Sequence, residues 1–301
     1  MILPRPMFGR SGRPPGDPIA NRWAILALPA IVFLVLFFLV PLIYIGARSV
    51  SEFPKGVEPS LLANYQRFFA SEANVRVLVN TFWIAGLSTV ACLVIGYPYA
   101  YLTTIVKPRM AAVLLIAVLI PFWSSLLVRT YAWEVILRDT GVINRTLLAI
   151  GIIEEPLPLI RTTLGVLLGM TQILLPFMVL PLYSVMRRID PEYTRAAANL
   201  GARPATAFIR IFVPLSLPGI MAGGLLVFVL ALGFYITPAL LGSPRDTMIS
   251  QFIANQVQQR LDWGMASAMA AILMVLTFAV LLIASRFVRI RDVFGAVGEE
   301  S

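Results

Sequence analysis

The sequence contains no histidine, one cysteine and only two lysines among its 301 residues. Without histidine, and with Cys92 as the one thiol, the chain lacks the usual ligands of a zinc or iron–sulfur site and cannot form an intrachain disulfide. Neither Lys55 nor Lys107 belongs to a G-x4-G-K-[ST] phosphate loop, so an ATPase site of that type is absent. We therefore expect no metal site, no catalytic residue and no resident cofactor in this chain.

Charge of either sign is also scarce, since 13% of residues are charged and 59% are hydrophobic, whereas a soluble domain has about 25% charged residues. Crossing about 30 Å of hydrocarbon takes about 20 apolar residues in a helix. The windows without charge are 23–47, 77–106, 110–128, 162–186, 211–244 and 263–285. Uninterrupted runs of this length fit helices and not barrel strands. The expected fold class is an all-α integral membrane protein with six transmembrane helices.

The basic residues predict the orientation of these helices. One set of connecting segments holds 14 of the 24 Lys and Arg residues with six acids, and the other set holds ten with nine acids. The positive-inside rule then places both termini in the cytoplasm. The net charge of +9 is thus a signal of topology, and we expect membrane lipid and no nucleic acid as its partner.

The boundaries follow from the windows. They are a cytoplasmic tail at 1–22, the first transmembrane helix at 23–47, an outer segment at 48–76, a core at 77–288 with five transmembrane helices, a hairpin at 187–217 within that core, and a cytoplasmic tail at 289–301. Residues 61–69 (LLANYQRFF) predict a short amphipathic helix. In the long fifth window, Pro214 and Pro218 suggest that the crossing starts near Gly219. The spacings Gly165-x3-Gly169 and Gly219-x3-Gly223 predict closely packed helices.

The hairpin carries the most specific signals. Asp190 suits the N-cap of a helix, Pro191 its first position and Glu192 its positive end. Three alanines continue the helix and Gly201 predicts its end, with a second short helix at 204–212. An alanine face would let another backbone come close, with Tyr193, Leu200 and Phe208 filling a groove on a cytoplasmic partner. The alternative is a solvated, positively charged loop.

The same residues resemble a known signature. Arg195-Ala196-Ala197, Gly201 and the segment 211–214 (IFVP) match the spacing of E-A-A-x3-G-x9-I-x-L-P in permeases of binding-protein-dependent ABC importers, with Arg195 in place of Glu and Val213 in place of Leu. The segments 120–133, 141–144, 174–186 and 232–242 look like the spermidine/putrescine branch of that family. The resemblance covers roughly residues 20 to 288.

The resemblance implies a type I importer in the bacterial inner (plasma) membrane, and this chain would be a transporter subunit and not an enzyme. Two permease subunits, alike or different, would form the pathway for polyamines or a related small solute. Two cytoplasmic subunits would hydrolyse ATP-Mg, and a periplasmic or lipid-anchored binding protein would deliver substrate. Residues 190–201 would be the coupling helix. The residues expected to couple to the ATPase are Asp190, Glu192, Tyr193, Arg195, Ala196, Ala197, Leu200, Gly201, Phe208 and Pro214.

A polycation pathway would offer aromatic faces and carboxylates. The candidates are Trp123, Tyr131, Trp133, Glu134, Phe234 and Tyr235. For the aromatic residues, an interfacial belt is the alternative, and Glu134 has Arg138 at i+4 as an ordinary partner. Arg129 would repel a polycation unless it snorkels outward or pairs with Glu134; otherwise an anionic or neutral substrate becomes more plausible.

Two other functions remain open at this point. An ion-coupled secondary carrier would keep ionisable groups or broken helices at the midplane. Here the windows have no charge, and Asn80, Gln172 and Thr237 offer only neutral oxygens, which more often join helices to one another. A membrane scaffold that does not transport could use the same docking hairpin.

Overall fold

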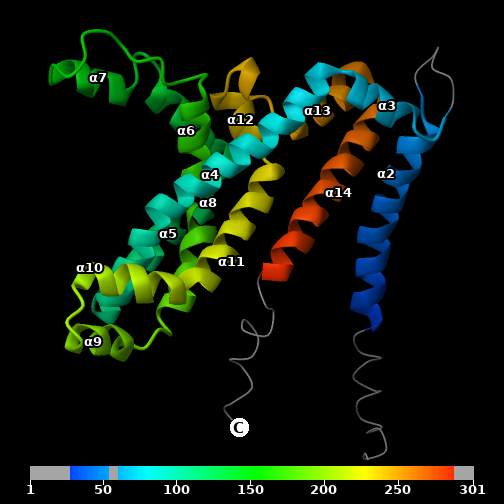
Figure 1. Ribbon diagram of the computed structural model, residues 1–301. Coiled ribbons are helices and arrows are strands. Elements are labelled where there is room, and N and C mark those ends of the chain that lie inside the picture. The colour runs from blue at the N-terminus through cyan, green and yellow to red at the C-terminus, as the bar shows by residue number, and fades with distance from the viewer. Residues whose placement is uncertain (1–27, 54–59, 288–301) are drawn as a thin grey trace, which may run out of the picture.

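The computed structural model describes residues 28–53 and 60–287, and every regular element in these ranges is helical (Figure 1). Five helical runs are long and apolar enough to cross a membrane: Leu28–Ser51, Glu72–Ile105, Thr163–Met186, Pro204–Leu232 and Trp263–Arg286. A sixth crossing requires that two helices joined by a sharp bend count as one span. The all-helical membrane architecture is therefore confirmed, with five crossings or six. The predicted tails at 1–22 and 289–301 lie outside the described residues.

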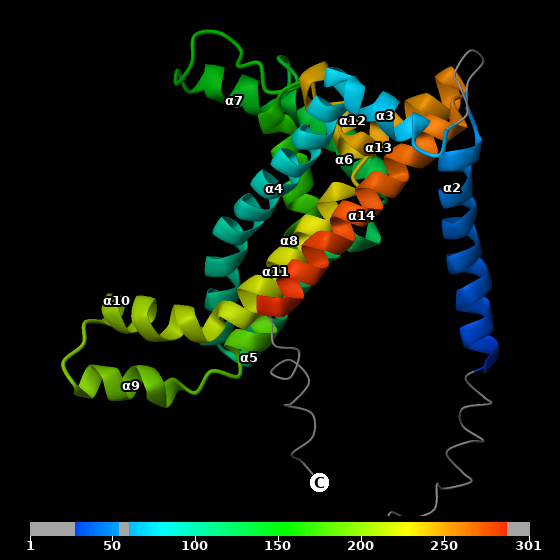
Figure 2. The ribbon, with the colours of Figure 1, turned by 45° about the vertical axis from the view of Figure 1, so that its right-hand side comes forward.

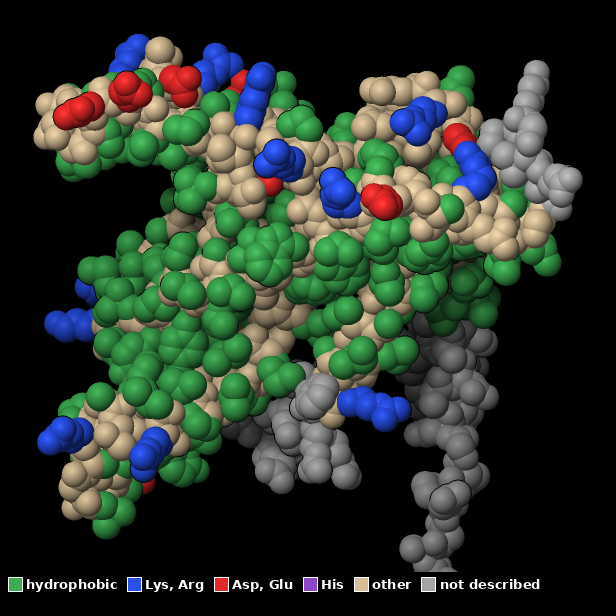
Figure 3. Space-filling view, turned by 45° about the horizontal axis from the view of Figure 1, so that its top comes forward, with side chains coloured by type: hydrophobic (Ala, Val, Ile, Leu, Met, Phe, Trp, Pro, Cys, Tyr) green, Lys and Arg blue, Asp and Glu red, His purple; other side chains and the backbone are tan. Residues whose placement is uncertain are grey.

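In chain order the elements are η1 (Val35–Leu39), α2 (Val40–Ser51), α3 (Ala63–Ala70), α4 (Glu72–Ile105), α5 (Pro108–Leu119), η2 (Ile120–Trp123), α6 (Leu126–Leu137), α7 (Val142–Ala149), α8 (Thr163–Met186), α9 (Pro191–Asn199), α10 (Pro204–Ala207), η3 (Phe208–Phe212), α11 (Val213–Leu232), α12 (Ile236–Leu241), η4 (Pro244–Asp246), α13 (Ile249–Asn255), η5 (Gln256–Arg260) and α14 (Trp263–Phe287). The hairpin of α9 and α10 lies at one end of the bundle, and α3, α7, α12 and α13 lie at the other (Figures 1 and 2). We call these the α9 end and the α12 end. Charged side chains gather at both ends and a hydrophobic belt lies between them (Figure 3).

The centre of the bundle is formed by α4, α8 and α11, whose buried side chains make one cluster. Glycines allow α11 to approach α8, and α8 to approach α12. A Cβ atom at Gly223 would lie 3.0 Å from the backbone oxygen of Met178, and one at Gly169 would lie 2.6 Å from Cδ1 of Leu241. The predicted close packing at both Gly-x3-Gly pairs is confirmed.

The fifth apolar window, 211–244, is not one crossing. A continuous helical run passes from α10 through η3 into α11, and its 29 residues rise about 44 Å. The two prolines do not divide this helical run, and a start of the crossing near Gly219 stays a prediction. Pro214 is the second residue after the π-helical turn η3, where the hydrogen-bond ladder is already interrupted, and the helix continues through Pro218. The run ends at Leu232 instead, and α12 begins after a short break.

The third apolar window, 110–128, is also broken. Ser124 and Ser125 adopt extended backbone conformations after η2, and the helical segments Pro108–Trp123 and Leu126–Ala149 are bent by 98°. The hydroxyl of Ser124 donates to the carbonyl of Pro121 at 2.8 Å, which satisfies a backbone group at the bend. The window 110–128 therefore does not form one continuous helix.

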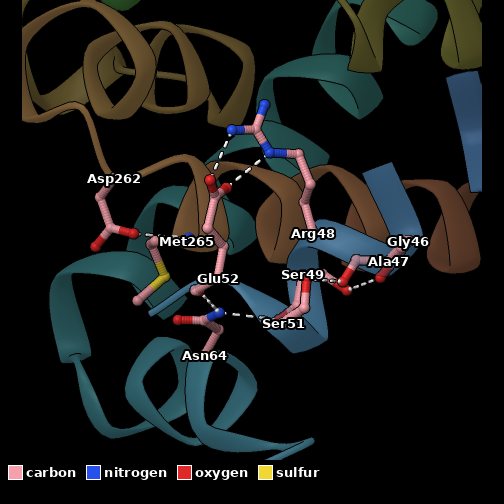
Figure 4. Close-up of polar contacts among 9 residues, drawn as sticks. All are labelled: Gly46, Ala47, Arg48, Ser49, Ser51, Glu52, Asn64, Asp262 and Met265. Carbon is pink, nitrogen blue, oxygen red and sulfur yellow. Dashed lines mark hydrogen bonds and ion pairs between the residues drawn. The ribbon is translucent and has the colours of Figure 1, made fainter. Parts of the chain in front are cut away.

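The first crossing contacts α14 and α3 near the α12 end, and Figure 4 shows polar contacts in this region. Nε and Nη2 of Arg48 donate to the two carboxylate oxygens of Glu52 at 2.7 Å each. Asn64, from the predicted short helix that α3 confirms, donates to the backbone carbonyl of Glu52 at 2.9 Å. Arg67 pairs with Asp262, which precedes α14, at 2.9 Å. The second half of the first crossing, α2, packs against α14, whereas residues 28–40 are apolar and exposed. Figure 2 shows this lower part apart from the bundle.

Candidate functional site

The helix α9 begins and ends as the sequence predicts. Oδ1 of Asp190 accepts a hydrogen bond from the backbone N–H of Glu192 at 2.9 Å, and Pro191 occupies the first turn. Gly201, directly after Leu200, has a φ of 84°, a conformation that glycine adopts at the lowest cost. The cap, the proline and the terminating glycine together fix a short helix at the extreme of the α9 end.

One face of α9 packs against the chain's own α10 and η3. Ala197 is the buried residue of α9, and Ala207 is the buried residue of α10, whereas Ala196 and Ala198 are exposed. The prediction that Ala197 faces a partner is therefore corrected. Its small side chain lets the two arms of the hairpin approach each other.

The rest of the surface of α9 is open. Tyr193 is 57% exposed and Leu200 is 90% exposed, so both side chains project as predicted. The arginines of the hairpin are exposed as well: Arg187, Arg188, Arg195, Arg203 and Arg210. Within the described residues, none of them forms an ion pair. The hairpin thus presents apolar side chains and unneutralised positive charge together.

Phe208 does not project from the hairpin, which corrects the prediction that it fills a partner's groove. Its ring lies 5.0 Å from that of Tyr101 and 6.2 Å from that of Tyr97, both on α4, and it stacks on Phe212 at 5.5 Å. The hydroxyl of Tyr97 also lies 2.9 Å from that of Ser216 on α11. These aromatic contacts connect the hairpin to α4 and α11. Pro214 lies in the first turn of α11 and not on the open face.

The candidate pathway residues on α6 have ordinary partners as well as exposure. Tyr131 is 53% exposed, and Trp133 is half-buried. Glu134 accepts a hydrogen bond from Arg138 at 2.7 Å, so the alternative of a local ion pair is confirmed. Arg129 does not pair with Glu134, and its buried Nε has no hydrogen-bond partner among the described residues.

The structure brings α6 to the segment that follows α11. The hydroxyls of Thr130 on α6 and Thr237 on α12 lie 3.4 Å apart. Glu134 and the α12 segment line one cavity of about 600 Å³ at the α12 end. Phe234 and Tyr235 lie in the break just before α12. Five of the six pathway candidates therefore lie on α6 or at this break, whereas Trp123, 85% exposed, lies on the other side of the bend at Ser124 and Ser125.

The sequence interpretation missed a group of buried polar contacts at the α12 end. Asp246 is 3% exposed and accepts hydrogen bonds from the backbone N–H and hydroxyl of Ser243 and from the hydroxyl of Thr163. Asn80 donates to two backbone carbonyls of the 245–247 segment, at 2.9 and 3.1 Å. Asn80 thus joins α4 to η4 and the residue that follows it. The S-x2-D spacing at 243–246 is the local signal for the cap, but nothing local points to Thr163 or Asn80.

Comparisons with known proteins agree with this architecture, although no family model matches the chain. The chain is 34% identical over 254 residues to the spermidine/putrescine transport system permease protein PotB of Haemophilus influenzae, covering 82% of this chain and 88% of that protein. It is 36% identical over 256 residues to PotB of Escherichia coli K12, covering 83% and 92%. A solved bacterial alginate ABC transporter, in complex with an alginate pentasaccharide-bound periplasmic protein, has the same fold, with a TM-score of 0.71 and 20% identity over 90% of this chain and 96% of that chain.

Proposed function

Because the chain belongs to the spermidine/putrescine branch of ABC importer permeases, we propose that it lines a substrate pathway across the inner membrane and is driven through α9. On this proposal α9 is a coupling helix that docks on a cytoplasmic ATP-binding subunit. The observation that carries it is the capped helix at the extreme of one end, with Tyr193 and Leu200 exposed and the helix packed on α10 and η3. The α9 end is then cytoplasmic, in agreement with the distribution of arginines.

The proposed assembly contains a second permease, two ATP-binding subunits that hydrolyse ATP-Mg, and a periplasmic or lipid-anchored binding protein at the α12 end. The apolar residues 28–40 of the first crossing, which are exposed, and the positively charged hairpin are surfaces that such partners would cover. Movement of α9 would reach the spans through the contacts of Phe208 with Tyr97 and Tyr101.

The proposed substrate is a polyamine, because the relatives at 34% and 36% identity are spermidine/putrescine permeases by name. Tyr131, Trp133, Phe234 and Tyr235 offer aromatic faces for cation contacts near Glu134. Uptake by the reconstituted complex should therefore prefer spermidine and putrescine over small anions. A preference for an anion would instead assign Arg129 to substrate binding.

Two substitutions test the docking of α9. Ala197→Pro breaks the helix, and Gly201→Asp forces a strained left-handed conformation on its exit turn. Both should leave the subunit inserted but abolish co-purification of the ATP-binding subunit and ATP-dependent uptake. Gly151→Asp is the matched control, since Gly151 has a φ of 70° and open space around it, as Gly201 does, but lies beyond α7 at the α12 end. Unchanged co-purification and uptake in both α9 variants would reject the assignment.

The orientation and the energy source are tested separately. In a background without Cys92, a cysteine at Tyr193 should react with an impermeant maleimide only in inverted vesicles, and one at Ile152 only in right-side-out vesicles. Uptake that continues without ATP while an ion gradient remains would favour the secondary carrier. ATPase binding without any transport would favour the scaffold.

A further inference from the structure

The outermost position of α9 is occupied by an arginine. At about 100° per residue, Arg195 lies about 160° around the helix from Ala197, the residue that packs inward. Its side chain therefore points away from α10, η3 and the spans, and it is exposed. Glu192 and Asn199 share this outer face.

The charge of Arg195 is not neutralised within the hairpin. The ion pairs in the described part of the chain join Arg48 with Glu52, Arg67 with Asp262, and Arg138 with Glu134. Glu192, one turn before Arg195, is not within ion-pair distance, and the nearby Asp190 is engaged as the helix cap. Arg195 is thus ready to contact an acceptor outside this chain.

We propose that the ATP-binding subunit presents a carboxylate to Arg195, in a docking groove that is acidic at this point; this inference rests on the proposed docking of α9. An arginine covered by a partner loses its water, and leaving it unpaired in the interface is costly. A carboxylate accepts two parallel hydrogen bonds from the planar guanidinium and so replaces the hydrogen bonds that water had made. The same contact selects the partner, because a groove that is basic at this point repels α9.

Lipid headgroups are the other source of negative charge, and the geometry disfavours them for Arg195. Arg187 and Arg188 directly follow α8, and Arg210 lies in η3, which continues into α11, so these residues are the ones next to the spans. In both ribbon views α9 lies on the far side of α10 from the bundle (Figures 1 and 2). Arg195, on the outer face of α9, is therefore turned away from the membrane.

The test measures how tightly the ATP-binding subunit binds the permease in nanodiscs. The subunit is the one that supports uptake in the reconstituted complex described above. Arg195→Glu should weaken binding by more than about tenfold, since the loss of one desolvated charge pair exceeds about 1.4 kcal/mol. Arg195→Gln should have a smaller effect, and Arg195→Lys the smallest. Arg203→Glu is the matched control, because it makes the same charge change on an exposed arginine at the α9–α10 turn; its effect should stay within about twofold. An acidic residue of the ATP-binding subunit changed to lysine should restore binding to Arg195→Glu.

The outcomes separate this inference from the proposed function. If Gly201→Asp abolishes binding but Arg195→Glu does not weaken it, α9 docks and the carboxylate contact is wrong. If Arg195→Glu and Arg203→Glu weaken binding equally, only the general positive potential matters and the inference is again overturned. A loss seen in discs with anionic lipid but not in discs of neutral lipid would assign Arg195 to the membrane. Since Arg195 is exposed, melting of all variants at the wild-type temperature shows that a loss of binding is not a loss of fold.

Discussion

The contact between α8 and α11 gives a stringent prediction, because two adjacent glycines of α11 have different surroundings. A Cβ atom at Gly223 would meet the backbone oxygen of Met178 at 3.0 Å and its Cα at 3.3 Å. A Cβ atom at Gly224 would meet only Cγ2 of Thr89, at 3.8 Å, which is an ordinary contact. The same substitution to alanine therefore probes a tight site and an open one within one turn of one helix.

The expected magnitudes follow from two opposing effects. Alanine stabilises a helix relative to glycine by about 1 kcal/mol, and this gain applies to both positions. At Gly223 the new methyl group must displace backbone of α8, an overpacking that costs about 1–3 kcal/mol. Gly224→Ala should thus be neutral or stabilising, and Gly223→Ala should be less stable than Gly224→Ala by about 1–3 kcal/mol.

Unfolding of both variants by SDS in mixed micelles, followed by circular dichroism, measures this difference on one scale. The comparison cancels the effect of the detergent and of the helix propensity. If Gly223→Ala is as stable as Gly224→Ala, then α8 and α11 are not in backbone contact at Met178, and the packing argument for the second Gly-x3-Gly pair fails.

Three further predictions concern other parts of the chain. Asp246→Asn should lower the free energy of unfolding by about 1–3 kcal/mol, because an amide N–H2 would face the donors of Ser243 and Thr163, whereas the exposed Asp139→Asn should change it by less than about 0.5 kcal/mol; SDS unfolding compares the two. Cys92 is fully buried, so maleimide should label the folded chain about 100-fold more slowly than the SDS-denatured chain, and fast labelling would place Cys92 at a surface. The hydrogen bond from Arg48 lowers the pKa of Glu52 below its ordinary value of 4.5. The carboxylate therefore stabilises the fold above that value and loses this effect as the pH falls through the lower folded pKa. The difference in melting temperature between the wild type and Glu52→Gln should disappear at low pH, and a constant difference from pH 7 to 3 would contradict the pairing.

The sequence predicts those parts of the fold that depend on near neighbours. The start and end of α9 depend on Asp190, Pro191 and Gly201, all within a few residues of the helix, and these predictions are confirmed. The orientation of Ala197 and Phe208 depends on α10 and α4, which no local pattern identifies. The same limit applies to Asn80, because the sequence shows a polar residue in a span but does not identify its partners at 245–247.

The prolines near α11 show the limit most clearly. Pro214 and Pro218 suggested a break, yet the helix continues through both, whereas the break occurs at Gly233–Tyr235, just before the turn that holds Pro238. The difference lies in the neighbours of each segment. Thr237 and Leu241 of α12 are fully buried and pack against Gly169 of α8. The hydroxyl of Ser250 donates a hydrogen bond to the carbonyl of Phe234 in the break. The position of Phe234 and Tyr235, and with it the expected substrate contact, is therefore determined by the glycine face of α8 more than 60 residues earlier in the chain.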